Sequence, residues 1–593
     1  MMANVADQKK MSHLQTLIEM LRRSAENTEN ASGIVYINDK GEEEWISYYE
    51  LWNLAASYGS TLKDRGVKPD DRIGIIVPTS KEFLGAFWGA LYVGAIPFAL
   101  YPPTLMESIS EYQKKIRRVL SHAEPAAIIT IPPIRTVIMN STQGTLSKNI
   151  LIPKNFTGHS LYEPAKRSST DVAFMQFTSG STALPRGVVL THENVLSNIR
   201  AISTALIISD KDIGISWLPP FHDMGLIGKL MVFVYNNTKL IWMSPQYFLR
   251  SPIRWLEAVS KYGGTISAAP NFAYSLCVRR VRDKDLPNLN LSSWRLALNG
   301  AEMVDPSTIR AFIKKFAPCG FKPEAMFPAY GLAESSLAVT FPRLNAKPVI
   351  DTINRKILAE EGRAETVEEN PSLSLSLASC GKAIPTIEVK VVDENGKERE
   401  ECMVGEIEVS GPSVCNGYYK NKEATGKIIK DGWLYTGDLG YIKNGNLYIT
   451  GRIKDMIIIR GRNYIPQDIE TAAEEIRGVR KGRTVAFSVF DKETSSEKGF
   501  AAVEVSTDNP EERARIRNDV LKKIQETIGI RLRDVILLKP GALPKTSSGK
   551  LQRSLAKKLY LEDILTKRGR MNRLKWMLDF YLQRIIKIFR KNP

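Results

Sequence analysis

The chain has 593 residues, of which 43% are hydrophobic, 25% are charged and five are cysteine. This composition is typical of a soluble globular enzyme and excludes collagen-like, disulfide-scaffold and wholly disordered proteins. The cysteines are widely spaced and form no C-x-x-C pair, so we expect neither a structural zinc site nor a disulfide framework. Together with an N-terminus that lacks the apolar core of a signal peptide, this favours a cytoplasmic location.

The net charge of +18 is unevenly distributed along the chain. Residues 551–593 contain twelve Lys or Arg and three acidic residues, a net charge of +9, so the other 550 residues carry only +9. A nucleic-acid enzyme more often carries basic residues interleaved with aromatic residues along a groove. We therefore expect a basic tail and no nucleic-acid partner.

The first half of the chain alternates between apolar strands and helical stretches. The clearest strands are 71–80, 126–131 and 239–243, and the helical stretches include 195–205 and 252–262. This alternation predicts an α/β fold with parallel sheets that are covered on both faces.

One uncharged stretch, residues 83–106, is similar in composition to a membrane span. A span needs roughly 20 apolar residues in one helical run, whereas Pro97, Pro102 and Pro103 interrupt this stretch. We therefore expect a buried helix over 84–92 and a core strand over 95–100.

The second half changes to short strands joined by hairpin signals. Tight turns are predicted at 394–396 and 443–445, where Asn precedes Gly. Beyond Arg452 the pattern predicts a helix, two strands and a second helix in this order, which indicates a separate small α+β lobe. The polar stretch 351–377 precedes these strands and is typical of a solvated loop or a short helix with a flexible tail.

Small and hydroxyl residues are concentrated in one loop between two apolar strands. The loop contains Thr178, Ser179, Gly180, Ser181 and Thr182, followed by Arg186. Successive small residues expose backbone N–H groups in a concave turn, which suits a polyphosphate, and the arginine adds a positive charge. The loop is not a Walker A loop, because it lacks the G-x-x-x-x-G-K-S/T pattern. A plain Ser/Thr/Gly hairpin is the alternative.

Six further motifs follow this loop in chain order. They are WLPPFHDMG at 217–225, NGAE at 299–302, PAYGLAESS at 328–336, GWLYTGDLG at 432–440, GRIKD at 451–455 and LPKTSSGK at 543–550. Each motif alone could be a simple turn, but the six motifs in this order are a much more specific signal than any one of them.

In this order the motifs resemble those of the acyl-adenylate-forming superfamily of acyl-CoA synthetases, peptide-synthetase adenylation domains and luciferases. The resemblance covers nearly the whole chain, residues 12–560, and the sequence looks most like a fatty acyl-AMP ligase. Three features point to this branch: the form WLPPFHDMGLIG, the segment PNFAY at 270–274, and the polar insertion before 379–381.

The resemblance implies an α/β architecture with a large N-terminal domain over 1–453, made of two α/β subdomains and a β-barrel. A small mobile α+β lid domain would follow over 454–560, with Lys454 at its hinge, and 561–593 would form a basic amphipathic tail. The stretch 351–377 would be a ligase-type insertion that packs against the lid and hinders its rotation.

The resemblance also assigns nucleotide-binding roles to the motif residues. The 178–187 loop would hold the β- and γ-phosphates of ATP. Tyr330, followed by Gly331, would stack on adenine, and Asp438 and Arg452 would bind the ribose hydroxyls. The adenine pocket would be lined by Asn299, Gly300, Ala301 and Glu302.

Catalysis would depend on residues that bring two anions together. Lys550 would reach in from the lid to bridge the fatty carboxylate and the α-phosphate, and Glu334 would hold Mg²⁺. Both would stabilise the charge of the in-line transition state, so no protein nucleophile is required. His222 and Phe221 would lie where the acyl tunnel meets the phosphate. The acyl pocket would include Asn271, Phe272 and Tyr274.

Two residues depart from the phosphate loop of this family, T-S-G-S/T-T-G-x-P-K-G. Ala183 replaces the last interior glycine of the loop. If the backbone needs a positive φ at this position, the alanine would be strained where a glycine would not. Arg186 replaces the lysine and changes a point charge into a planar fork. We expect these changes to alter the contacts of the loop but not its location.

The expected activity converts a medium- or long-chain fatty acid and ATP to fatty acyl-AMP and pyrophosphate. The acyl group would then pass to the phosphopantetheine thiol of a separate acyl carrier protein, because no carrier motif follows Lys550. One alternative is an acyl-CoA synthetase with the same first half-reaction. Another is a non-catalytic membrane-binding or nucleic-acid-binding protein that kept the fold.

The basic tail has a helical pattern of its own. Apolar residues recur at helical spacing along 571–590, and the basic residues fall largely on the opposite side. Such a helix could lie on an anionic membrane, which would make the protein peripheral at the membrane surface. It could equally pack its apolar side against the lid or a partner.

Overall fold

The computed structural model describes residues 14–27, 32–103, 109–142, 149–153, 156, 162–178, 185–370, 373–459, 462–491, 496–546 and 549–567. At 140–142, 178 and 496 it describes the backbone alone. The phosphate-loop residues Ser179, Gly180, Ser181 and Thr182 and the tail segment 568–593 lie outside these ranges, so what the sequence predicts for them stays a prediction. Within the described ranges, no helix combines the length and apolar character needed to cross a bilayer.

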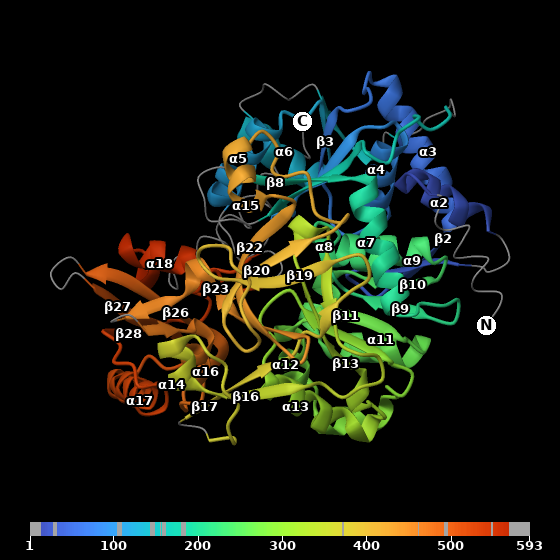
Figure 1. The fold of residues 1–593 in the computed structure, drawn as a ribbon. Helices are drawn as coiled ribbons and strands as arrows, with labels where there is room; N and C mark the ends of the chain where they lie inside the picture. The colour runs from blue at the N-terminus through green and yellow to red at the C-terminus, as the bar shows by residue number, and fades with distance from the viewer. Residues whose placement is uncertain are drawn as a thin grey trace.

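The first part of the chain forms a six-stranded sheet in the order β6-β5-β3-β4-β7-β8 (Figure 1). All neighbouring strands are parallel except β7 and β8, which confirms the α/β prediction. The strands are β3 (Arg72–Ile76), β4 (Ile96–Ala99), β5 (Ala127–Thr130), β6 (Ile150–Leu151), β7 (Val172–Thr178) and β8 (Arg186–Thr191). The helices of this region are α3 (Tyr48–Asp64), α4 (Lys81–Tyr92), α5 (Ile109–Ala123) and α6 (Pro132–Thr142).

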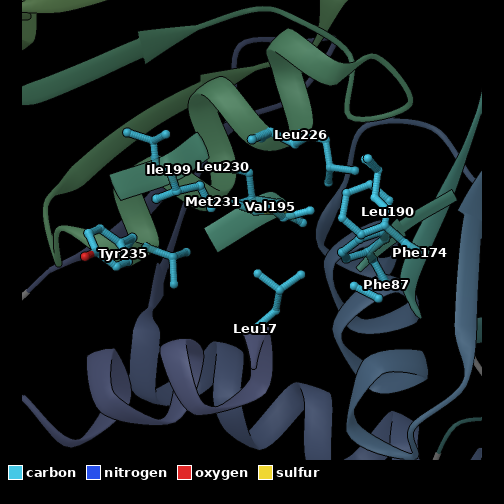
Figure 2. Close-up of a cluster of buried hydrophobic side chains, with 14 of the residues drawn as sticks. Leu17, Phe87, Phe174, Leu190, Val195, Ile199, Leu226, Leu230, Met231 and Tyr235 are labelled. Atoms are coloured by element: carbon cyan, nitrogen blue, oxygen red, sulfur yellow. The ribbon is translucent and has the colours of Figure 1, made fainter. Parts of the chain in front are cut away.

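The described part of the uncharged stretch, residues 83–103, contributes to the core through a helix and a strand, as predicted. Helix α4 begins where the Ser80 side chain accepts a hydrogen bond from the Phe83 N–H, and its Phe87 and Trp88 side chains are fully buried. Figure 2 shows Phe87 in a cluster with Leu17 and with Leu190 of β8. This apolar cluster joins helices from both halves of the large domain.

The second sheet has seven strands in the order β13-β12-β11-β9-β10-β1-β2, parallel except for the β1–β2 pair. Its strands are β1 (Gly33–Ile37), β2 (Glu43–Ser47), β9 (Ile213–Ser216), β10 (Lys239–Met243), β11 (Ile266–Pro270), β12 (Leu296–Gly300) and β13 (Met326–Pro328). The helices near it are α2 (Leu17–Glu26), α7 (His192–Ala205), α8 (Asp223–Gly225), the π-helical turn η3 (Leu226–Met231), α9 (Val232–Tyr235), α10 (Pro245–Arg250), α11 (Ile253–Tyr262), α12 (Asn271–Arg280) and α13 (Pro306–Phe316). Strand β10 coincides with the predicted strand, and α11 begins one residue later than predicted.

Antiparallel strands follow, where a β-barrel was expected. Among the described strands they form a three-stranded sheet, β14-β15-β18, and a five-stranded sheet in which β23 pairs with β22. They are β14 (Tyr330–Gly331), β15 (Ala338–Phe341), β18 (Lys382–Ala383), β19 (Glu388–Val392), β20 (Gly405–Ser410), β21 (Ile429–Lys430), β22 (Trp433–Lys443) and β23 (Asn446–Arg452). The predicted turn between β22 and β23 is confirmed, because Asn444 (φ 51°) and Gly445 (φ 69°) adopt the left-handed conformations of a two-residue hairpin.

The C-terminal lobe has its own sheet, β26-β27-β28, and its own core around Ile469, Ala501 and Ile524. The predicted order of helix, strand, strand, helix is confirmed, and a parallel third strand is added. The elements are η8 (Ile453–Asp455), β24 (Ile457–Ile459), β25 (Arg462–Tyr464), α16 (Pro466–Glu474), β26 (Val479–Asp491), β27 (Ser496–Val505), α17 (Pro510–Ile528), β28 (Asp534–Leu538) and α18 (Arg553–Leu561). In Figure 1 this orange and red lobe lies beside the green seven-stranded sheet.

The polar stretch 351–377 is not a solvated loop. Strands β16 (Ile350–Asn354) and β17 (Ser374–Ala378) form an antiparallel pair, and α14 (Arg355–Glu361) follows the first strand. Burial of Ile353 and Leu377 beside the ring of Tyr441 stabilises the pair. The average polarity of the stretch concealed the alternation of serine and leucine at 372–377, which is the period of a half-buried strand.

Candidate active site

One large cavity, of about 3440 Å³, lies where the seven-stranded sheet, the antiparallel strands and the C-terminal lobe meet. Ligands of open parallel sheets bind beyond the carboxyl ends of the strands, and the loops after β9, β11 and β12 line this cavity in the same way. It brings together most of the residues that the sequence motifs predict. They are Arg186, Phe221, His222, Asn271, Phe272, Gly300, Ala301, Glu302, Tyr330, Gly331, Glu334, Asp438, Arg452, Lys454 and Lys550.

A hydrogen-bonded group of three residues lies at one wall. The hairpin register sets Asp438 on β22 opposite Arg452 on β23, with Arg452 Nε 2.7 Å from Asp438 Oδ1. The Tyr330 hydroxyl donates to Asp438 Oδ2 at 2.8 Å. Burial and the adjacent Asp438 carboxylate raise the pKa of Tyr330 well above its usual value, so the phenol stays a neutral donor. Asp438 is thus held in place with lone pairs left for further donors.

The loop after β12 brings backbone close to the cavity. A Cβ added at Gly300 would lie 2.6 Å from the Ala329 carbonyl oxygen, and Ala301 has a positive φ of 65°. Asn299 does not line the cavity, contrary to the prediction, because alternate residues of a strand point to opposite faces. Its buried Nδ2 donates to Asn271 Oδ1 at 3.1 Å and so positions the start of α12.

Lys550 of the C-terminal lobe approaches two carboxylates of the large domain. Glu302 accepts a hydrogen bond from the Phe272 N–H at 2.7 Å, and burial raises its pKa although Lys550 opposes the shift. Burial lowers the pKa of Lys550, and Glu302 and Asp223 act against this shift. The Lys550 backbone is held in its turn, because its N–H donates to Thr546 Oγ1 at 3.0 Å.

His222 and Asp223 form a pair at the start of α8. The His222 Nδ1 lies 2.6 Å from Asp223 Oδ1, and the Met224 N–H donates to the same carboxylate oxygen at 2.6 Å. Burial opposes ionisation of Asp223, but its pKa is lowered because His222 and Lys550 outweigh that effect. The sequence prediction included His222 and missed Asp223, although the aspartate adjoins the histidine in the same motif.

Glu334 is a further acid of the site and lies near Arg186, at the described end of the predicted phosphate loop. The Tyr418 hydroxyl donates to Glu334 Oε1 at 2.7 Å, and the Arg186 guanidinium lies 5.4 Å from the centre of the Tyr418 ring. Tyr418 was not predicted, because it belongs to none of the motifs. Among the described residues there is no cluster of three acidic, histidine or cysteine ligands. A lone carboxylate is compatible with Mg²⁺, which binds one or two protein carboxylates together with substrate phosphates.

The predicted acyl-pocket residues divide between two faces of α12. The Phe272 ring packs edge-on against Trp217 at 6.1 Å between centroids and faces Gly549 of the C-terminal lobe. The prediction that Tyr274 lines the pocket is wrong. Its side chain is 0% exposed, packs against Trp255, and donates its hydroxyl to the Leu298 carbonyl at 2.7 Å. Positions two residues apart on a helix differ by about 200°, so Phe272 and Tyr274 face opposite ways.

The insertion contacts the C-terminal lobe directly. Arg355, the first residue of α14, lies with its Nε 2.6 Å from Asp468 Oδ2 and donates from Nη1 to the Thr527 carbonyl. Glu360 at the other end of α14 pairs with Arg462 at 2.6 Å. In Figure 1, α14 lies against α16 of this lobe. Lys454 is in the short 3₁₀ turn η8 that joins β23 to β24, the position predicted for a hinge.

Comparison with known proteins gives a consistent result. A family model described as AMP-binding enzyme matches residues 21–419. The chain is 34% identical to the medium-chain-fatty-acid–(acyl-carrier-protein) ligase JamA of Moorena producens, over 93% of this chain and 96% of that protein. It is 33% identical to a long-chain-fatty-acid–AMP ligase of Mycolicibacterium smegmatis, over 84% of this chain and 86% of that protein. A solved structure from a study of fatty acyl-adenylate ligases of E. coli and L. pneumophila matches with a TM-score of 0.87 and 34% identity, over 93% and 98% of the two chains.

Proposed function

The chain belongs to the AMP-binding enzyme family, and we propose that it joins a medium- or long-chain fatty acid to the AMP part of ATP. A carboxylate oxygen of the fatty acid attacks the α-phosphorus, the bond from that phosphorus to the bridging oxygen breaks, and pyrophosphate leaves. The observation that carries this proposal is the approach of Lys550 to Glu302 and Asp223 in a cavity that also contains Tyr330 and Asp438. Two anionic reactants repel each other, and a preorganised ammonium group offsets that repulsion at the transition state.

The nucleoside would bind at the wall formed by Tyr330, Asp438 and Arg452. The Tyr330 ring lines the cavity and could stack on adenine, and Asp438 keeps lone pairs for the ribose hydroxyls. The loop from Gly300 to Glu302 would border the base, where the close backbone approach leaves no room for a side chain at Gly300.

The polyphosphate would extend toward Arg186 and Glu334. We propose that Glu334 holds Mg²⁺, with the Tyr418 hydroxyl fixing the orientation of the carboxylate. When bound, Mg²⁺ would neutralise charge on the phosphate oxygens. Arg186, whose guanidinium lies over the Tyr418 ring, would add a second positive charge.

The acceptor of the acyl group would be a separate acyl carrier protein. The name of the Moorena producens relative includes such an acceptor. The contacts from Arg355 and Glu360 to the C-terminal lobe support an insertion that restrains rotation of this lobe. An acyl-CoA synthetase is therefore our second hypothesis, since transfer to CoA requires a lid that rotates freely.

The domain division and the tail are part of the same proposal. An N-terminal domain over 1–453 and a lid over 454–560 would meet at the η8 turn, with 351–377 as the insertion. The tail 561–593 would carry a membrane-surface contact through 571–590, and liposome flotation of the full chain against a chain ending at 567 would test that contact.

A product assay tests the activity. The purified chain would be incubated with ATP, Mg²⁺ and a series of fatty acids, with either CoA or a phosphopantetheinylated carrier protein. We expect pyrophosphate and fatty acyl-AMP by mass spectrometry, and acyl transfer to the carrier protein only. Abundant acyl-CoA would favour the synthetase, and absence of pyrophosphate with every acid would reject both enzymatic functions.

A further inference from the structure

One buried lysine of the cavity lining, Lys229, has no role in the chemistry described above. Lys229 is 2% exposed and belongs to the π-helical turn η3. Within the described ranges it has neither a hydrogen-bond partner nor an ion-pair partner, and its Nζ lies 5.5 Å from the centre of the Phe233 ring. An unpaired buried ammonium group is unfavourable, so it points to a ligand of opposite charge.

The fold directs Lys229 toward the cavity. Figure 2 shows Leu226, Leu230 and Met231 of the same turn packed into the hydrophobic core, which leaves the other side of the turn for the lysine. A π-helical turn is rare and is found frequently at functional sites. Burial lowers the pKa of Lys229 to about 7, and no neighbouring carboxylate counteracts this shift.

The cavity wall around Lys229 is apolar. Ile202, Val232, Phe233 and Leu337 line the same cavity. His222 caps the helical segment that contains Lys229 and precedes it by seven residues, so roughly two helical turns separate the two side chains along the axis. An acyl chain that starts near Lys550 and His222 would therefore pass along this wall to Lys229.

We propose that Lys229 binds a second carboxylate at the far end of the acyl chain, so that the preferred substrate is a medium-chain dicarboxylic acid. This inference rests on the proposed function and names its substrate class. The reacting carboxylate of this substrate binds Lys550. The second carboxylate forms a charge-assisted hydrogen bond with Lys229, and apolar surroundings strengthen such a pair. A plain fatty acid leaves the lysine unpaired and binds less well.

The test measures pyrophosphate release by the full chain with a homologous series of dicarboxylic acids and the monocarboxylic acids of equal length. Lys229→Met replaces the ammonium with an apolar group of similar length, and Lys211→Met on the surface is the matched control. We expect kcat/KM to be highest for one dicarboxylic acid. Lys229→Met should lower that value by roughly 30-fold or more and raise the value for the monocarboxylic acid of equal length. Lys211→Met should keep the preference of the natural chain.

A binding measurement supplies a readout that is independent of turnover. The preferred dicarboxylic acid should raise the Tm of the natural chain and of Lys211→Met, but not that of Lys229→Met. Equal kcat/KM for both acid types, or an equal loss for both in Lys229→Met, would overturn the role of Lys229. Absence of pyrophosphate with every acid would instead overturn the proposed function, so the two failures are distinguishable.

Discussion

The guanidinium of Arg355 and the carboxylate of Asp468 form an ion pair between the insertion and the C-terminal lobe, with Nε 2.6 Å from Oδ2. The two side chains are only 12% and 11% exposed, so water screens the pair little. The same arginine donates to the Thr527 carbonyl, which ties it to the end of α17 as well. This contact reinforces an apolar cluster in which Ile353 and Leu358 of the insertion pack with Ile465 of the lobe.

Removing one partner of this pair should loosen the lobe. Arg355→Ala leaves Asp468 buried without its cation, and breaking a buried pair costs about 3–5 kcal/mol. We expect faster amide hydrogen exchange in α14 and β25 and a measurable gain of acyl transfer to CoA. Arg363→Ala is the control, because Arg363 pairs with its neighbours Glu361 and Glu365 at the surface. Unchanged exchange in Arg355→Ala would show that the pair does not restrain the lobe.

Lys550 should be required for adenylation. Loss of one preorganised contact to the transition state costs about 10²–10³ in rate. Lys550→Ala should therefore lower ATP–pyrophosphate exchange by about that factor. The exposed Lys522 on α17 provides the control, and Lys522→Ala should retain full exchange. Equal exchange rates in the two variants would contradict the assignment.

The Tyr330 hydroxyl should contribute to nucleotide binding through Asp438. Tyr330→Phe keeps the ring but removes the 2.8 Å hydrogen bond to the carboxylate. A hydrogen bond to a charged group contributes about 1.5–3 kcal/mol, so we expect the KM for ATP to rise about tenfold or more. Tyr274→Phe removes the hydroxyl of a buried tyrosine outside the cavity and should lower the Tm without raising that KM. A raised KM in both variants would indicate a general loss of structure.

His192 should make the protein less stable in acid. Its Nδ1 accepts a hydrogen bond from the Leu17 N–H at 3.2 Å, and burial lowers its pKa to about 4. The unfolded pKa is about 6.5, so the neutral folded form contributes stability above that pH and loses it as the pH falls toward 4. The full contribution is about 3 kcal/mol.

Urea unfolding across this pH range tests the prediction. His192→Asn should show a smaller decrease in the free energy of unfolding between about pH 6.5 and 4 than the natural chain. His122→Asn, which changes a partly exposed histidine, should show the natural decrease. Parallel curves for the natural chain and His192→Asn would exclude His192 as the source.

Local sequence patterns predicted much of the fold. Strand β10, helix α11 and the 443–445 turn follow from apolar periodicity and from Asn-Gly chemistry, which depend on neighbours a few residues away. Most of the residues that the ordered motifs predict also line the cavity. Three of these motifs, 217–225, 299–302 and 328–336, lie at the ends of the parallel strands β9, β12 and β13, which meet at one edge of the sheet.

Other features of the protein depend on residues that are distant in the sequence, so only the tertiary structure could show them. The strands of the insertion are stabilised by Tyr441, and Asp468 meets Arg355 although 113 residues separate them. Phe272 and Tyr274 point in opposite directions because of where α12 begins. Lys229 has no acidic partner among the described residues, because the packed chain places the Phe233 ring, and no carboxylate, beside it. Periodicity is a property of adjacent residues, whereas burial and charge pairing are properties of the packed chain, so the motifs located the site and the packing determined which side chains reach it.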